Sequence, residues 1–226
     1  MSCGSPGRAR RSHRTLLRCV GAGAIALLCS ECGGSQLLIP NELEQSGDRL
    51  EIEQIGPADA SLRLAEFQVT LIEPPDGRVV ESSGTSIVHW SVSVEGAGQR
   101  AMLQCEAHYG APGKDPMVAP DARLRCEAEG MKLEVGGKGQ RPGQGEFELD
   151  GVDYVVEAIY DVDSGEPPAV PAGYSLRLAF NVMAAAEAIA PADPGAVILS
   201  RHVTGRTRAG LMVAAVALLK FTVSAV

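Results

Sequence analysis

The sequence predicts an all-β protein built as an antiparallel sandwich or barrel. Apolar residues recur at every second position through most of residues 61–182, which is typical of strands with one buried face. Turn-forming clusters of proline, glycine and aspartate separate seven or eight such segments. Helical patterns do not alternate with these segments, so an α/β fold is not expected.

The clearest strands are Asp150–Val162 and Tyr174–Val182, joined by a turn-rich segment. We expect them to form an antiparallel pair whose apolar face needs a second layer to cover it. Its inward residues are predicted to be Val152, Tyr154, Val156, Ala158, Tyr160 and Val162 in the first strand, and Tyr174, Leu176, Leu178, Phe180 and Val182 in the second.

The preceding strands follow the same alternation, and Arg78–Glu81 is expected to add a short edge piece. The inward residues are predicted to be Phe67, Val69 and Leu71; Val88, Trp90, Val92 and Val94; Ala101, Leu103, Cys105, Ala107 and Tyr109; Leu124, Cys126 and Ala128; Met131, Leu133 and Val135; and Phe147 and Leu149.

Cys105 and Cys126 both fall on inward faces, which favours a disulfide between them over two buried free thiols. Closing a loop of about 20 residues would contribute on the order of 3 kcal/mol in the loop-entropy model. The bond requires an oxidising compartment, and the N-terminus indicates one.

Residues 1–32 are interpreted as an export leader. Five arginines precede Val20–Leu28, a nine-residue apolar run that suits a signal peptide and is too short to span a bilayer. Cys29 and Cys32 follow, in a segment that resembles the lipobox of bacterial lipoproteins. This resemblance implies acylation at one of these cysteines, although Leu28 and Glu31 stand where the lipobox has a small residue. A cleaved secretory signal, an uncleaved anchor and a CxxC metal or redox pair are the alternatives.

Two further segments flank the predicted strands. Residues 33–60 have no sustained period and are expected to form a tether. In residues 183–226, Met183–Ala190 favours a helix, and an apolar stretch follows at Ala209–Val226. As a helix, that stretch is marginal for a membrane span, and it contains Lys220. A membrane anchor, an element docked on the domain and a segment that never orders therefore all remain open.

The segment Phe67–Gly96 contains a strand, a Pro-Pro-Asp-Gly turn, a valine pair and a long alternating strand. Near the other end, Asp150 stands four positions before Tyr154. These features resemble the beginning and the end of bacterial immunoglobulin-like domains. The resemblance covers residues 67–182 and implies a two-sheet sandwich in which Tyr154 packs at a corner. Val156 stands where antibody-type domains have their second cysteine, so their inter-sheet disulfide is not expected.

Charge and composition limit the function classes. The formal net charge is −8, and because both ends are basic, residues 33–200 carry −16. With a single tryptophan and 4% aromatic residues, the chain lacks both the basic patch and the stacking platforms of nucleic-acid-binding proteins.

The candidate sites are few. His89 and His108 are expected on the outer faces of strands, where with Glu106 they would form a surface metal site or simply be surface residues. Asp161 and Asp163 imitate part of a calcium loop but also suit an ordinary turn. The glycine-rich segment Gly136–Gly145 is interpreted as a hairpin turn. The carboxylates Glu146, Glu148, Asp150 and Asp153 are interpreted as a solvated acidic edge.

The sequence therefore predicts a non-enzymatic module that needs no cofactor, exported to the bacterial cell envelope and tethered to the membrane by a lipid or signal anchor. An envelope protein or a glycan is the expected partner, and nucleic acid is not. One alternative is a secreted metal-dependent hydrolase that uses His89 and His108. The other is a scaffold anchored to the membrane at both ends.

Overall fold

The computed structural model describes residues 41–52, 60–81, 84–110, 122–136, 143–160, 171–187 and 195–224, all within the unit Gly34–Val226. In chain order, its elements are α1 (Asn41–Ser46), β1 (Gly47–Ile52), β2 (Ala60–Leu64), β3 (Phe67–Ile72), β4 (Arg78–Val80), β5 (Ser86–Gly96), β6 (Gln99–Tyr109), β7 (Arg123–Ala128), β8 (Met131–Val135), β9 (Gln144–Leu149), β10 (Val152–Ile159), β11 (Gly173–Leu178), β12 (Asn181–Glu187), β13 (Gly195–Ser200) and α2 (Gly205–Ser224).

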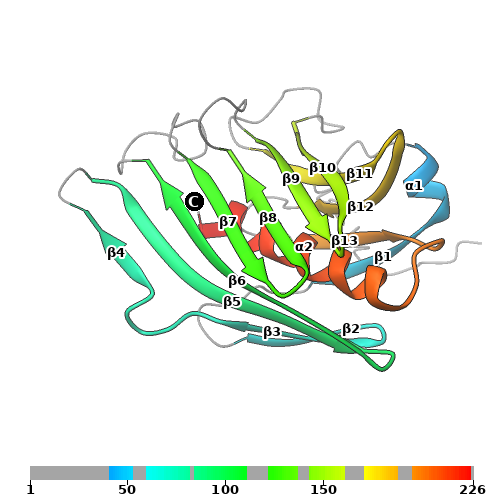
Figure 1. The fold of residues 1–226 in the computed structure, drawn as a ribbon, viewed down its shortest axis with the longest axis horizontal. Helices are drawn as coiled ribbons and strands as arrows, with labels where there is room; N and C mark the ends of the chain where they lie inside the picture. Colours follow the sequence, from blue (N-terminus) through cyan, green and yellow to red (C-terminus); the bar gives the residue numbers. More distant parts are fainter. Residues whose placement is uncertain are drawn as a thin grey trace, which may run out of the picture. The chain divides into compact units, whose positions relative to one another are not determined.

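These strands form one thirteen-stranded antiparallel sheet (Figure 1). Its order is β1-β13-β12-β11-β10-β9-β8-β7-β6-β5-β3-β2, and β4 also pairs with β5. Most neighbours in the sheet are consecutive in the chain, as expected when short turns join hairpins. The sheet curves until β1 and β2, its two end strands, contact each other, so it is nearly closed.

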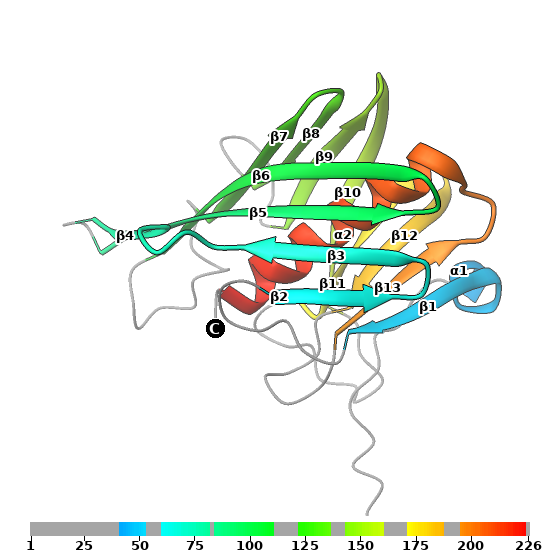
Figure 2. The ribbon, with the colours of Figure 1, turned by 90° about the horizontal axis from the view of Figure 1, so that it is seen from below.

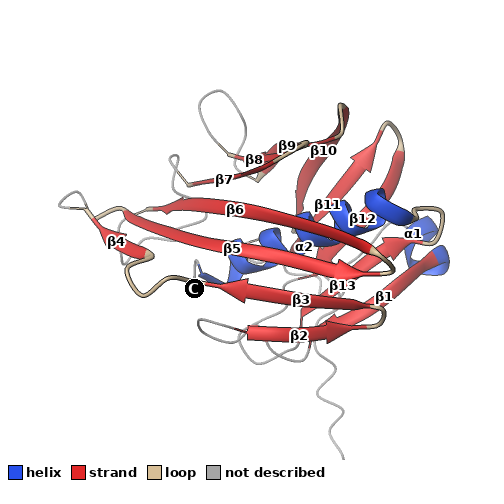
Figure 3. Ribbon diagram, turned by 60° about the horizontal axis from the view of Figure 1, so that its bottom comes forward, coloured by secondary structure: helices blue, strands red, loops and turns tan. Residues whose placement is uncertain are grey.

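Helix α2 lies on the inner side of this curve. Figures 2 and 3 show it running behind β5 and β6, with β11, β12 and β13 on its other side. The helix is apolar around its whole circumference, and every residue in 211–219 is buried. Such a helix must be covered on all sides. The curved sheet provides this cover, and the helix in turn buries the inner face of the sheet.

Two contacts show how closely the helix fits. At its N-terminal end, Gly210 lies against Leu149, and a Cβ at this position would be 2.7 Å from the Cδ2 atom of Leu149. At the other end, the hydroxyl of Tyr109 donates a hydrogen bond to the carbonyl oxygen of Phe221 over 2.9 Å, and the two rings stack 5.4 Å apart. The helix is therefore fixed to the sheet at both ends.

The all-β antiparallel prediction is confirmed, and so is the short edge strand at Arg78–Val80. Nearly all the inward residues predicted from Phe67 to Leu149 are buried, with Ala128 half-buried. The layer that covers them differs from the expectation, however. In an immunoglobulin-like sandwich a second sheet packs on the first, whereas here the inner face of a single sheet packs on α2.

Two predictions about residues 174–190 are wrong. Tyr174–Val182 is not one strand, because a two-residue turn at Ala179 and Phe180 separates β11 from β12. Tyr174 and Leu176 are buried as predicted, whereas Leu178 and Phe180 are exposed. In the segment predicted as a helix, Met183–Ala190, the described residues 183–187 belong to β12, because pairing with β11 and β13 outweighs a weak local helix preference.

The sheet extends past both predicted domain limits. Within the expected tether, α1 covers a small outer core around Leu43, Ala185 and Ile198, and β1 pairs with β13. Beyond residue 182, β12 and β13 continue the sheet. β13 was not predicted, because residues 196–199 form an unbroken apolar run without alternation, as expected for a strand buried on both faces.

The C-terminal apolar stretch is a docked helix, one of the three alternatives left open by the sequence. No helix in the described ranges has the length and apolar character needed to cross a membrane. Lys220, which interrupts the stretch, is largely buried, and its Nζ lies 3.0 Å from Oε2 of Glu73 after β3. Within the fold, this lysine therefore has an anionic partner.

Three arginines before and within the first turn of α2 bind acids of the surrounding strands and turns. Arg206 makes two hydrogen bonds to Asp150, of 2.6 and 2.9 Å. Arg208 pairs with Glu66 at 2.9 Å and with Asp48 at 3.0 Å, and Arg201 also binds Asp48, at 2.8 Å. Cations at a helix N-terminus oppose the helix dipole, and these carboxylates offset the repulsion. We call these six residues the arginine clamp.

Candidate functional site

The histidines singled out in the sequence lie together on the outer side of β5 and β6. In the strand register, His89 is opposite Glu106, while His108 lies two positions further along β6 and opposite Arg123 of β7. Outward residues of adjacent strands at the same level are within reach of one another. The predicted proximity of His89, His108 and Glu106 is therefore confirmed.

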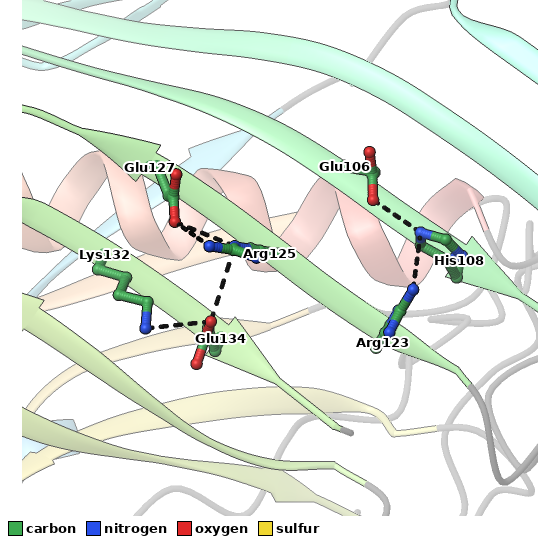
Figure 4. Close-up of polar contacts among 7 residues, drawn as sticks. All are labelled: Glu106, His108, Arg123, Arg125, Glu127, Lys132 and Glu134. Carbon is green, nitrogen blue, oxygen red and sulfur yellow. Dashed lines mark hydrogen bonds and ion pairs between the residues drawn. The ribbon is translucent and has the colours of Figure 1, made fainter. Parts of the chain in front are cut away.

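Glu106 contacts both histidines of this cluster. Its Oε1 lies 2.7 Å from Nε2 of His108, as Figure 4 shows, and its Oε2 lies 3.7 Å from Nδ1 of His89. Nη2 of Arg123 lies 3.4 Å from Nε2 of His108. The hydrogen bond with His108, helped by the nearby positive charges, lowers the pKa of Glu106 below its ordinary value.

A second set of charges continues across β7 and β8. Arg125 binds Oε1 of Glu127 through Nη2 at 2.5 Å, and its Nε lies 3.7 Å from Glu134. Lys132 binds the same carboxyl group of Glu134 at 3.2 Å (Figure 4). The hydrogen bond to Glu127 raises the pKa of Arg125. We call the outward residues His89, Glu106, His108, Arg123, Arg125, Glu127, Lys132 and Glu134 the paired face.

The chemistry that the paired face supports is limited. His108 and Glu106 are close enough to exchange a proton, and the charges of the cluster are balanced within it. Arg123 places a further positive charge beside His108, which disfavours a cation there. In the part of the chain that the structure describes, no group of three or more His, Cys, Asp or Glu side chains can hold a metal ion.

The other predicted site residues lie elsewhere. Cys105 and Cys126 are register partners on the inner faces of β6 and β7, and a disulfide joins them. Asp150 adopts a positive φ in the β9–β10 turn and binds Arg206 of the arginine clamp. Tyr154 is buried beside the ring of Phe147, and burial raises its pKa. Cys29, Cys32, Asp161 and Asp163 lie outside the described residues.

A different surface lies across β9 and β10. The outward residues Glu146, Glu148 and Asp153 are acidic, and neither strand contains a lysine or an arginine. The register places Glu146 opposite Glu134, and it places Glu148 between Asp153 of β10 and Lys132 of β8; like charges in directly opposite positions destabilise a sheet. No ion pair joins these three acids to any other residue that the structure describes. The predicted acidic edge is therefore present, without Asp150.

Exposed apolar side chains lie beside these acids. Val155 of β10 is 48% exposed, and Leu178 and Phe180, at the end of the β11–β12 hairpin, are 37% and 90% exposed. Val155 is the register partner of Arg177 in β11, so the β11–β12 turn that carries Phe180 follows within three residues of this pair, whereas Leu178, next to Arg177, points to the opposite side of the strand. We call Glu146, Glu148, Asp153, Val155 and Phe180 the acidic–apolar face.

The turn that presents Phe180 is not built from the residues that form such turns most readily. Ala179 has a φ of 54°, a conformation that costs a residue with a side chain roughly 1–2 kcal/mol. Glycine or asparagine would adopt it at lower cost. This surface was not predicted, because the apolar alternation placed Phe180 on the buried face of a continuous strand; Asn181, next to the turn, was the available signal.

Comparison with known proteins finds no match to this chain among protein-family models, curated proteins or solved structures.

Proposed function

We propose that this chain is an exported, membrane-tethered module of the bacterial cell envelope that binds or supports another molecule and has no catalytic activity of its own. The observation that carries the proposal is the position of α2. Its buried side chains occupy the inner side of the curved sheet, so a partner must be met by the outer faces, edges and loops.

The sequence supports the remaining parts of the proposal. The basic segment and the short apolar run before Cys29 and Cys32 support export and a lipid tether. The net charge of −16 on residues 33–200 disfavours nucleic acid and favours an envelope protein or a glycan as partner. In this proposal the module serves as immunoglobulin-like domains do, presenting loops and strand edges, and this part rests on analogy alone.

Cell fractionation with radiolabelled palmitate tests the tether. We expect the chain in the membrane fraction with label incorporated, and both properties lost in the double variant Cys29→Ser/Cys32→Ser. The single variants identify the acylated residue. The intact chain in the soluble interior of the cell, leader included, would contradict the proposal. Persistent membrane association of the unlabelled double variant would favour an uncleaved signal anchor.

Metal analysis tests the hydrolase alternative. His89 and His108 both contact Glu106, which is the observation in its favour. Under the proposed function, purified chain dialysed against zinc retains much less than one equivalent, and His108→Ala does not change this value. Stoichiometric zinc that is lost in His108→Ala would replace the proposed function with a metal-dependent one. Glu127→Ala, on the same outer side of the sheet, is the matched control.

A further inference from the structure

We propose that the acidic–apolar face is the surface through which this module binds its partner, and that the partner is a protein whose contact surface is cationic with an apolar centre. The inference rests on the proposed function, because it assigns a binding surface and a partner chemistry to the proposed binding module. It follows from two features of β9–β12 and from their contrast with the neighbouring paired face.

The first feature is the exposure of Phe180. An aromatic side chain that is 90% exposed on a hairpin tip adds nothing to the core, and the backbone of its turn is unfavourable at Ala179. Val155 of the neighbouring strand β10 adds further exposed apolar surface. Exposed apolar residues that gather in this way typically mark a protein contact, and aromatic residues often dominate the binding energy.

The second feature is the uncompensated acidic charge beside Val155. Glu146 lies directly opposite Val155 in the register, and Glu148 lies opposite Asp153. Among the described residues, the neighbouring cations are paired with other acids: Lys132, which lies opposite Glu148 in the register, binds Glu134, and Arg177 binds Glu157, both at 3.2 Å. Lysine or arginine residues of a partner would relieve the repulsion among these acids, and a surface of anionic lipid would increase it.

The third observation is the contrast with the neighbouring paired face. There each carboxylate has a cationic or imidazole group within 4 Å, so a charged partner gains little by approaching. Both faces belong to one sheet and to adjacent hairpins, so the difference is not one of strand geometry. Glu146, Glu148 and Asp153 have no such group within 4 Å among the described residues, so they are available to an external partner.

The test uses the purified full-length chain and three synthetic twelve-residue peptides, composed of lysine and leucine, of lysine and serine, or of glutamate and leucine. Binding is measured by titration calorimetry and mapped by amide chemical shifts. We expect the lysine–leucine peptide to bind at least ten-fold more tightly than the other two and to shift amides of β9–β12. Phe180→Ser should weaken this binding at least ten-fold and leave the weak lysine–serine binding unchanged.

Val80→Ser is the matched control, because Val80 of β4 is also an exposed apolar residue, at 61%. This variant should keep the affinity for the lysine–leucine peptide within two-fold. An equal loss in both variants, or shifts spread evenly over the acidic surface, would overturn the proposal. So would a dimer of the chain, detected by sedimentation, that dissociates in Phe180→Ser, because the occupant would then be a second copy.

The result of the peptide-binding test is independent of the result of the acylation test. Peptide binding is measured on the isolated chain, so its absence would not affect the export and acylation results. Loss of acylation would likewise leave peptide binding intact. Equal thermal unfolding of wild type and Phe180→Ser confirms that the substitution changes the surface and not the fold.

Discussion

The inner and outer sides of the sheet obey opposite rules although they alternate along the same strands. On β8, Leu133 is buried against the core, whereas the preceding Lys132 lies outside and binds Glu134. The inner positions require apolar side chains of a volume that fills the core without water. The outer positions are constrained mainly by the charges of their cross-strand neighbours. The fold is therefore set by the inner side, and the surface chemistry is free to differ from hairpin to hairpin.

The largest loss of stability is expected when a buried side chain on the inner side is truncated. Leu133→Ala should lower the free energy of unfolding by about 2–5 kcal/mol, because it removes buried methyl groups and leaves a cavity. Lys132→Ala, one residue earlier, should change it by no more than about 0.5 kcal/mol. Urea unfolding followed by circular dichroism measures both values. Similar losses in the two variants would mean that the sides are not distinct.

The disulfide lies on the inner side of the sheet, and its removal should cause the next largest loss of stability. Replacing both cysteines, Cys105→Ser/Cys126→Ser, should cost about 3 kcal/mol, since the unfolded chain gains the freedom of a 21-residue separation. Urea unfolding of wild type with and without a reductant provides the comparison. If the double variant and the oxidised wild type unfold at the same urea concentration, the bond contributes nothing to stability.

Substitutions at Lys220 and Glu73 measure how much a largely buried ion pair contributes to stability. Lys220→Met should cost about 1–3 kcal/mol because Glu73 loses its partner, and adding Glu73→Gln should recover part of the loss. The matched outer pair is Lys132 and Glu134, whose coupling in the same double-mutant cycle should not exceed about 0.5 kcal/mol. A larger coupling for the outer pair would reverse the expected ranking.

Acid should weaken the outer charge pairs selectively. A hydrogen bond from Arg201, together with Arg208, lowers the pKa of Asp48, and His108 lowers that of Glu106. A carboxyl whose pKa is lower in the folded state stabilises it above the ordinary value near 4, and this contribution is lost as the pH falls through the lowered value. Stability should therefore decline from about pH 4 downward.

Urea midpoints measured between pH 6 and pH 2 check this decline. The double variant Asp48→Asn/Glu106→Gln should show a shallower slope below pH 4 than wild type. Arg201→Gln/Arg208→Gln should flatten the slope in the same way, because it removes the cations responsible for Asp48. An unchanged slope in both variants would show that other carboxyl groups dominate acid unfolding.

The smallest effects should separate the two outer faces. Glu146→Gln on the acidic–apolar face removes repulsion with Glu134 and should raise the free energy of unfolding by about 0.2–1 kcal/mol. Glu127→Gln on the paired face removes the partner of Arg125 and should lower it by a similar amount. Changes of opposite sign in the free energy of unfolding, measured by urea unfolding, would confirm that the two faces differ in charge compensation. Changes of the same sign would contradict it.

The alternation of single residues made the strands from β3 to β10 predictable. Phe67, Trp90, Leu103 and Phe147 all face inward because a strand with one buried face has a period of two. The same rule failed at Phe180, where a two-residue turn ends the register although the apolar alternation continues. It also failed for β13, where both faces are buried and alternation disappears.

The candidate sites were less predictable, because they depend on which strands become neighbours. The approach of His89 to Glu106 could be inferred from two consecutive strands joined by a tight hairpin. The arginine clamp could not, since Arg208 meets Glu66 across 142 residues of chain. Its basic residues beside an apolar stretch also suit a membrane flank, and only the closure of the sheet assigns them to Asp48, Glu66 and Asp150.

The order of elements along the chain has a consequence for biogenesis. Helix α2 comes after every described strand, so a growing chain presents the whole inner lining of the sheet before the twenty residues that cover it have been synthesised. Many proteins begin to fold during synthesis, from the N-terminus onward. Here such folding would stop at a sheet whose apolar inner face is still exposed and prone to aggregation. Such a chain would remain incompletely folded until α2 has been synthesised, and in that state a polypeptide can still pass through a translocation channel, as the proposed export requires.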